Sequence, residues 1–487
     1  MLITILVSLY STRIILNALG ERDYGIFSLV SGTILLLSFL NAAMTTSTQR
    51  YFSFFIGSGD EDKLTDIFKT SVILHLLIGF LIVFLLEIVS IFLFHGFLNI
   101  PQERLTAAKA IYHFMVVSTF FTINAVPYDS AINAHENLLF DAVVGVVEVV
   151  LKLAVAISLL YIERYDLLIW YGLFIAIVTI TSSIIKSTFC LYKYPETKIS
   201  NLLKIDMLLF REMFSFSGWN LFGAICGMGR SQGLAIILNL FFGPVINAAY
   251  GIANQVNSAL LNFSQNMLKA LNPQIMKSEG ANDRKQMLLL AIRGCKYAFF
   301  LLAFFTVPLL FETKYVLSIW LGNVPKYAVV FCRLTLLVSM LAMLTAGLRT
   351  AIQATGRIRA YQSIVGGIIL LNLPLAWLLL KIGLPAYIVL VSAIVIELLA
   401  SVMRVYFLNK IAFLSITNFL KNVIMRVLIP LFVNIIPLFF INSYISEGPI
   451  RLCVTCLSSS LILSMGIYFL GFEIDERRFV ISFITMS

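Results

Sequence analysis

The segment that says most about this chain reads Ile236-Ile237-Leu238-Asn239-Leu240-Phe241-Phe242-Gly243-Pro244-Val245-Ile246-Asn247-Ala248-Ala249-Tyr250-Gly251-Ile252. One apolar run ends at Gly243-Pro244, a pair typical of tight turns, and another begins directly after it. The pattern also stands near the N-terminus, as Ile14-Ile15-Leu16-Asn17-Ala18-Leu19-Gly20 and Asp23-Tyr24-Gly25-Ile26. A further pair, Ala131-Ile132-Asn133-Ala134 and Ala351-Ile352-Gln353-Ala354, is separated by 220 residues. Repeats this long predict two similar lobes.

The composition indicates an all-α polytopic membrane protein. Of 487 residues, 60% are hydrophobic and 12% charged, and the mean hydropathy is +0.95. A soluble domain has about 45–50% apolar and about 25% charged residues. The net charge of +10 would suit nucleic acid, but the basic residues lie in short loops between apolar runs, where membrane topology explains them. We therefore expect a lipid bilayer, and no nucleic acid, as partner.

Fourteen runs are long enough for spanning helices, which need about 20 apolar residues. They are 1–19, 24–46, 67–94, 108–127, 138–161, 167–192, 213–241, 245–270, 287–312, 327–352, 360–380, 384–408, 424–445 and 449–470. The repeat divides them into an N-lobe over residues 1–200 and a C-lobe over 201–408, each with six helices. Residues 409–487 add two helices and a tail.

The loops predict the orientation. With the N-terminus in the cytoplasm, the outer loops hold six basic residues, Arg22, Arg104, Arg164, Lys314, Lys326 and Lys381, against fifteen in the inner loops. Because cytoplasmic loops carry the excess of Lys and Arg, both termini are predicted to be cytoplasmic. Equivalent positions are six helices apart, so the two repeats have the same orientation and an axis along the membrane normal.

The repeat also predicts a longer natural N-terminus. Met1 aligns with Gly223, about ten residues into a helix that begins near Met213 and follows the basic stretch from Lys204 to Arg211. The first helix has no such beginning. We expect the natural chain to start upstream, which sequencing the N-terminus of the protein expressed from its native locus would test.

Polar side chains recur on one face of the run 245–270. They are Asn247, Tyr250, Asn254, Ser258, Asn262, Gln265 and Lys269, spaced by three or four residues. A weaker stripe follows the run 24–46. Polar groups inside a membrane are costly and indicate function, here the wall of a water-filled cavity between two lobes. The alternative is hydrogen bonding between packed helices.

Three arginines and one lysine are candidates for contacts with an anionic substrate. Arg13 stands one turn before Asn17, and Arg230 lies deep in the seventh helix. Arg50 and Lys269 fall at the cytoplasmic mouth. Gln232 and Asn239 share another face of the seventh helix, which is rich in glycine. The alternatives are snorkelling for Arg13 and a structural acidic partner for Arg230.

Glu148 and Lys152 are four residues apart with the acid first, the favourable order for an ion pair on a helix. Their role is either structural or one of ion or proton coupling. Glu87, Arg333 and Glu397 have no partner that the sequence shows.

Several chemistries find no support. No Walker motif is present, the four histidines form no metal-ligand cluster, and no Ser/His/Asp arrangement has suitable surroundings. Cys453 and Cys456 have the spacing of a redox or metal pair but fall inside a spanning run, so we interpret them as packing residues. The sequence therefore predicts a non-enzyme without cofactor or metal.

At this point the motifs resemble those of the polysaccharide (O-antigen type, Wzx-like) flippases of the MOP superfamily, which also holds the MATE drug exporters and lipid II flippases. The likeness covers essentially the whole chain. Its residues are Thr12-Arg13-Ile14-Ile15-Leu16-Asn17-Ala18-Leu19-Gly20, Asp23-Tyr24-Gly25-Ile26, Ser217-Gly218-Trp219-Asn220-Leu221-Phe222-Gly223, Gln232-Gly233, Phe241-Phe242-Gly243-Pro244, Asn247-Ala248-Ala249 and Asn272-Pro273-Gln274-Ile275.

The resemblance implies a bacterial inner-membrane protein that moves undecaprenyl-diphosphate-linked oligosaccharide from the cytoplasmic to the periplasmic leaflet by alternating access. It implies a part in lipopolysaccharide O-antigen, capsule or exopolysaccharide biosynthesis, with the polysaccharide polymerase machinery as a candidate partner. Arginine suits the diphosphate, and the amides and hydroxyls suit sugars. The rival is a MATE-like, cation-coupled multidrug exporter, which favours acids in the first lobe where this chain has Arg13. A membrane enzyme of envelope assembly is a further alternative.

Overall fold

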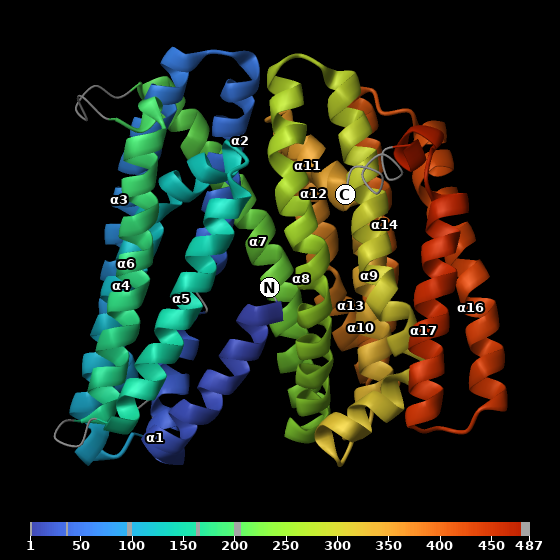
Figure 1. Ribbon diagram of the computed structural model, residues 1–487, viewed down its shortest axis with the longest axis horizontal. Helices are drawn as coiled ribbons and strands as arrows, with labels where there is room; N and C mark the ends of the chain where they lie inside the picture. The colour runs from blue at the N-terminus through green and yellow to red at the C-terminus, as the bar shows by residue number, and fades with distance from the viewer. Residues whose placement is uncertain (1, 36–37, 95–99, 162–165, 199–205, 479–487) are drawn as a thin grey trace. The chain divides into compact units, whose positions relative to one another are not determined.

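The computed structural model consists of helices joined by short connections (Figure 1). It describes residues 2–35, 38–94, 100–161, 166–198 and 206–478, and no strand occurs within these ranges. The predicted all-α class is thereby confirmed. Ten helices in this part of the chain are long and apolar enough to cross a membrane, or eleven if the bent pair α10–α11 forms one span. The count of fourteen stays a prediction, and Arg164 and Lys204 of the loop-charge argument lie outside the described residues.

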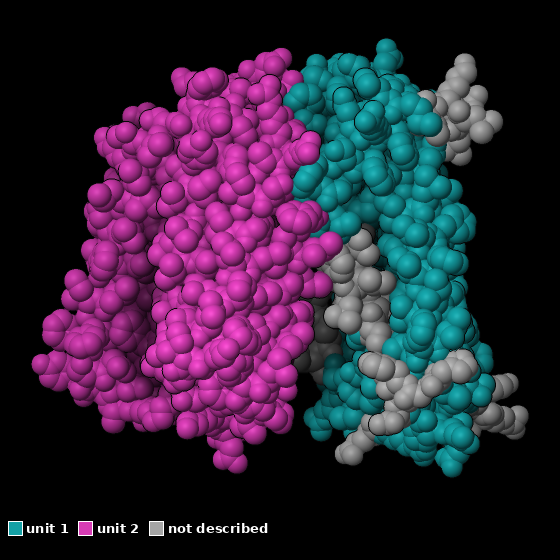
Figure 2. Space-filling view, turned by 180° about the vertical axis from the view of Figure 1, so that it is seen from behind, with its two compact units in different colours: residues 1–221 teal, residues 222–487 magenta. Residues whose placement is uncertain are grey.

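The chain forms two compact units, residues 1–221 and 222–487, coloured separately in Figure 2. Unit 1 holds α1 (Leu2–Leu35), α2 (Ser38–Ser58), α3 (Glu61–Phe92), α4 (Leu105–Ala134), α5 (Leu138–Ser158) and α6 (Leu167–Lys193). The short 3₁₀ segments η2 (Gln102–Arg104), η3 (Leu159–Tyr161) and η4 (Pro195–Thr197) flank α4, α5 and α6. α4 packs against α1, α2, α3 and α6.

The boundary between the units falls inside α7 (Met207–Phe242). Unit 2 continues with α8 (Pro244–Gly280), α9 (Arg284–Leu321), α10 (Ala328–Met343), α11 (Ala346–Ala354), α12 (Arg359–Leu370), α13 (Asn372–Lys381) and α14 (Ile388–Ala412). A last group is α15 (Ile416–Phe419), η5 (Leu420–Met425), α16 (Arg426–Tyr444), α17 (Pro449–Gly466) and η6 (Ile467–Gly471). α9 lies at the centre of this unit, against α8, α10, α11, α16 and α17.

The repeated motif forms the same turn in both units. Gly20 interrupts α1 with φ 75° and ψ 168°, and Gly243 precedes α8 with φ 78° and ψ −173°. An added Cβ at either glycine would meet no atom within 4 Å, so the backbone angle and not the available space requires glycine. The turn predicted at Gly243-Pro244 is confirmed, with Pro244 as the first residue of its helix, where the missing N–H costs nothing.

The second repeated motif, at residues 131–134 and 351–354, lies at equivalent helix ends in the two units. α4 ends at Ala134 and α11 at Ala354, which are the last residues of the two matching Ala-x-x-Ala motifs. The next helix starts at Leu138 in unit 1 and at Arg359 in unit 2. Positions 220 residues apart are therefore structurally equivalent around these two helix ends.

One ion-pair cluster fixes the turn at Gly20. Arg104 donates from Nη1 to Asp166 Oδ2 at 2.6 Å and from Nε to Asp23 Oδ1 at 2.8 Å. Asp166 also caps α6 by accepting the Leu168 N–H at 3.0 Å. Asp23 of the repeated motif thus ties the second half of α1 to the start of α4 and α6.

Candidate functional site

A charged cluster inside unit 2 is built on Glu397 of α14. Its carboxylate accepts from Arg230 Nη1 at 3.0 Å through Oε2 and from Arg404 Nη1 at 2.8 Å through Oε1. The side chains of Glu397 and Arg404 are 2% and 3% exposed, and that of Arg230 is 22% exposed. Buried charges persist only when they are paired and hydrogen-bonded, and Glu397 satisfies part of two guanidinium groups at once.

Close packing of α7 positions Arg230. A Cβ on Gly223 would lie 2.3 Å from Gln362 Oε1, and a Cβ on Gly233 would lie 2.6 Å from Leu373 Cδ2. These contacts bring α7 against α12 and α13 at two points, one on each side of Arg230. Gly223 and Gly233 therefore allow close packing of α7, as small residues do at helix interfaces in membranes.

Further polar groups surround the pair. Arg404 Nη1 also donates to Thr345 Oγ1 at 3.0 Å, and Tyr361 of α12 lies within the electrostatic influence of Arg404. Arg349 of α11 is exposed and lies within the electrostatic influence of Arg230, Arg404 and Glu397. Two arginines thus share one carboxylate with a third nearby, and the cluster has a net positive charge.

The predicted polar stripe of α8 divides into two parts. Asn247, Asn254 and Lys269 are half-buried and Ser258 is exposed, as expected of a face that meets polar surroundings. Tyr250 instead packs in the apolar core of unit 2, edge-on to Phe331 with ring centroids 6.3 Å apart. The role of the stripe as a cavity wall stays a prediction.

The other predicted residues lie outside this cluster. On α7, Gln232 and Asn239 are exposed. On α1, Arg13 and Asn17 are exposed as well. Arg50 of α2 is buried, and its guanidinium carbon lies 4.7 Å from the ring centres of both Tyr51 and Phe54.

The predicted pair Glu148–Lys152 forms, with Nζ 2.7 Å from Oε1. Ser182 of α6 donates to the other carboxylate oxygen at 3.0 Å. The pair therefore links α5 to α6 within unit 1, and its coupling role stays a prediction. The residues that seemed to lack partners have them. Glu397 pairs as described above, Glu87 contacts His113 Nδ1 at 3.1 Å, and Arg333 Nη2 lies 3.5 Å from the Phe311 carbonyl oxygen.

Unit 1 has its own charged cluster at the place equivalent to that in unit 2. Lys186 Nζ lies 2.9 Å from Asp129 Oδ1 and 3.2 Å from Asp141 Oδ1. Asp129 and Asp141 precede Arg349 and Tyr361 by 220 residues. The two repeats therefore carry charge clusters of opposite sign at corresponding helix ends.

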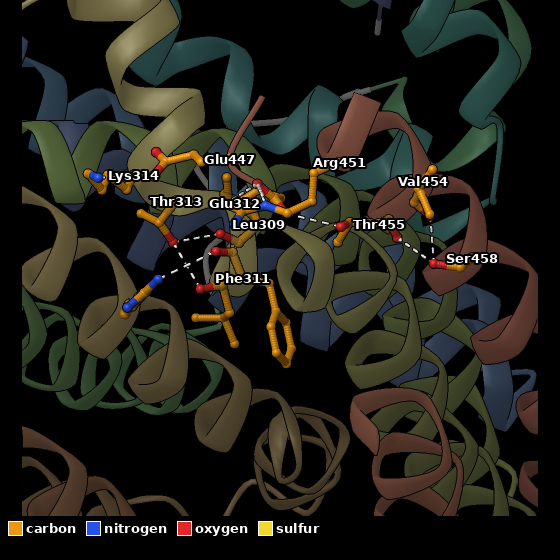
Figure 3. A network of polar contacts seen from close by, with 12 residues as sticks. Leu309, Phe311, Glu312, Thr313, Lys314, Glu447, Arg451, Val454, Thr455 and Ser458 are labelled. Carbon is orange, nitrogen blue, oxygen red and sulfur yellow. Dashed lines mark hydrogen bonds and ion pairs between the residues drawn. The ribbon is translucent and has the colours of Figure 1, made fainter. Parts of the chain in front are cut away.

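Sequence reasoning did not foresee a third network, which joins α17 to α9 (Figure 3). Arg451 Nε and Nη2 lie 2.9 Å and 3.1 Å from the carboxylate of Glu312, which is fully buried. Thr455 donates to the same carboxylate at 3.0 Å, and Lys314 pairs with Glu447 at 2.9 Å on the surface. No spacing rule connects residues 139 positions apart, and the only signal was an acid within an apolar run.

A fourth network holds the end of the described chain. Lys296 of α9 is buried and lies 2.8 Å from both oxygens of Glu476, to which Tyr297 also donates at 2.9 Å. Burial alone would raise the pKa of Glu476, but the hydrogen bonds from Lys296 and the Glu473 N–H lower it below 4.5. Among the described residues, no group of three or more His, Cys, Asp and Glu is arranged to hold a metal ion.

The arrangement of the helices is that of the MATE transporters. A MATE transporter crystallised as a single-residue mutant matches with a TM-score of 0.72 and 12% identity, over 84% of this chain and 92% of its own. A MOP superfamily transporter from Pyrococcus furiosus matches with 0.64 and 13%, over 86% and 95%. A eukaryotic MATE transporter gives 0.63 and 14%, over 84% and 93%. At these identities the likeness is one of fold.

The sequence adds one more specific match. Residues 1–157 fit the model of the MatE family, so the first part of the chain carries a MatE domain. No curated protein matches the sequence.

Proposed function

We propose that this chain is a membrane transporter of an anionic amphiphile, and specifically a flippase for undecaprenyl-diphosphate-linked oligosaccharide in the bacterial inner membrane. It moves its substrate from the cytoplasmic to the periplasmic leaflet by alternating access, and both termini are cytoplasmic. The MATE fold and the MatE domain support transport as the activity. The resemblance of the repeated motifs to Wzx-like flippases supports the substrate.

One observation carries the choice of an anion. In unit 2 the carboxylate of Glu397 is shared by Arg230 and Arg404, with Arg349 beside them. An excess of guanidinium inside a membrane protein attracts a further anion, and guanidinium is well shaped for phosphate oxygens.

The second candidate function is a MATE-like multidrug exporter. The fold is equally compatible with it, but a net positive cluster repels cationic drugs. One of the similar structures was described as having a binding pocket of reverse polarity that suggests a different function, so the fold accommodates more than one polarity. The two candidates differ in which variants disturb transport.

The test uses cells that lack this protein and carry a matching sugar pathway. A periplasm-restricted enzyme labels the lipid-linked oligosaccharide that has reached the outer leaflet. We expect labelling to depend on this chain, to fall at least about tenfold with Arg230→Ala, and to recover in part with Arg230→Lys, since a hydrogen bond to a charged group is worth about 1.5–3 kcal/mol. Arg333→Ala is the matched control, because Arg333 is an exposed arginine whose Nη2 lies 3.5 Å from the Phe311 carbonyl. Labelling without this chain would favour the exporter, and wild-type labelling in Arg230→Ala would remove Arg230 from the mechanism.

A further inference from the structure

Arg349 differs from the other arginines of the unit 2 cluster. Arg230 and Arg404 each contact Glu397, whereas the structure shows no hydrogen bond or ion pair from the Arg349 guanidinium to any described residue. Its side chain is exposed although it lies within the field of both neighbouring arginines. The Arg349 guanidinium, with its five N–H donors, is therefore available to bind an anion near Glu397 and its two arginines.

The helix break between α10 and α11 places Arg349 there. The two helices meet at 41°, and Thr345 at the break accepts from Arg404 while its carbonyl accepts the Arg349 N–H at 3.3 Å. Thr345 therefore links Arg404 of α14 to the first turn of α11, which carries Arg349.

The net charge of the cluster matches that of a dianion. Arg230, Arg349 and Arg404 carry three positive charges, and Glu397 supplies one negative charge, so the cluster has a surplus of two. In addition, the buried Nε of Arg404 has no hydrogen-bond acceptor within the described ranges. Glu397 Oε2 contacts Arg230 and Oε1 contacts Arg404, and neither oxygen is shown in contact with Arg349.

The repeat shows that this helix end does not require an arginine. The residue of unit 1 that corresponds to Arg349 is Asp129, and it forms an ion pair with Lys186 at 2.9 Å. The same helix end is thus stable with an acid in one unit and a base in the other. The arginine serves something other than the architecture of the helix end.

We propose that Arg349, with Arg404 and Arg230, forms a binding site for a phosphoryl dianion at the α10–α11 break, and that Glu397 is the resident counter-ion when the site is empty. The inference rests on the proposed function, since the diphosphate of a lipid-linked sugar is such a dianion. On binding, the phosphoryl oxygens accept from Arg349 and take over part of the donors that Glu397 holds. Glu397 thereby weakens binding and allows release.

The experiment measures binding of inorganic pyrophosphate to the full chain in lipid nanodiscs by calorimetry, at low and high salt. A second arm uses a polyprenyl diphosphate incorporated in the nanodisc and measures protection against thermal unfolding. The variants are Arg349→Ala, Arg349→Lys and Glu397→Gln, with Arg333→Ala as control. Folding of each variant is verified by its elution volume and its helix content.

We expect Arg349→Ala to weaken binding by about tenfold to a hundredfold, the loss typical of a charged hydrogen bond, with Arg349→Lys in between and the control unchanged. Glu397→Gln, where it folds, is expected to bind more tightly because the internal competitor is gone. Arg349 dependence in both arms means that the phosphoryl group suffices, and dependence in the lipid arm alone means that the site takes lipid headgroups only. Binding that is equal in wild type and Arg349→Ala in both arms would overturn the proposal. Arg349-dependent binding in a chain that fails the labelling experiment would leave the site standing and refute the flippase.

Discussion

The ion pair between α9 and α17 allows a quantitative test of how the terminal helices are held (Figure 3). Arg451→Met would leave the carboxylate of Glu312, which is fully buried, with Thr455 as its remaining partner among those shown. Breaking a buried pair by removing one partner costs about 3–5 kcal/mol. Because Thr455 still donates at 3.0 Å, we expect the lower end, about 3 kcal/mol.

The double variant Glu312→Gln with Arg451→Met removes both charges and keeps an acceptor for Thr455. We expect it to cost less than the single variant, so that the coupling energy in the cycle is at least about 2 kcal/mol. The measurement is reversible unfolding in mixed micelles of rising denaturing detergent. Lys314→Met is the control, because Lys314 is 69% exposed and its pair with Glu447 contributes at most about 1 kcal/mol. The reasoning would be refuted by a double variant that loses as much as the two single variants together.

Two further predictions concern packing and pH. Gly233→Ala should lower the melting temperature, since its Cβ would come within 2.6 Å of a leucine methyl on α13. Gly227→Ala is the control and should leave the melting temperature unchanged, because its Cβ would meet nothing within 4 Å. Thermal unfolding in detergent compares the two variants, and equal shifts would contradict the packing argument. The pKa of Glu476 is lowered in the folded state, so its pairing with Lys296 stabilises fully above pH 4.5 and this contribution is lost as the pH falls through the lowered pKa. The stability difference between wild type and Glu476→Gln should therefore shrink in acid, and a pH-independent difference in unfolding free energy would speak against it.

The sequence predicts the helices of this protein well because hydrophobic length is a local property. The expected run 138–161 coincides with the span formed by α5 and η3, and 167–192 differs from α6 by one residue. The repeat also locates the turns at Gly20 and Gly243. Hydrophobic length does not predict where a span is broken. The expected run 327–352 is interrupted between Met343 and Ala346 by a bend of 41°.

The candidate site is predictable only in part, since charge pairing in a helical bundle joins distant segments. Arg230 stands out because it is a charge deep in an apolar run, but its partner Glu397 lies 167 residues away. Arg404 looks like the usual basic residue near a helix end and is in fact 3% exposed. Arg349 becomes visible only when the repeat is extended by two residues, to compare it with Asp129.

The two glycine turns also explain where the internal repeat is visible in the sequence. At φ 75° and 78°, a residue with a side chain is strained at Gly20 or Gly243 whatever surrounds it. Lipid-facing positions on the neighbouring helices accept many apolar side chains, so their residues are weakly constrained. The turns, by contrast, require glycine. The internal repeat is therefore easiest to recognise in the sequence around these two turns.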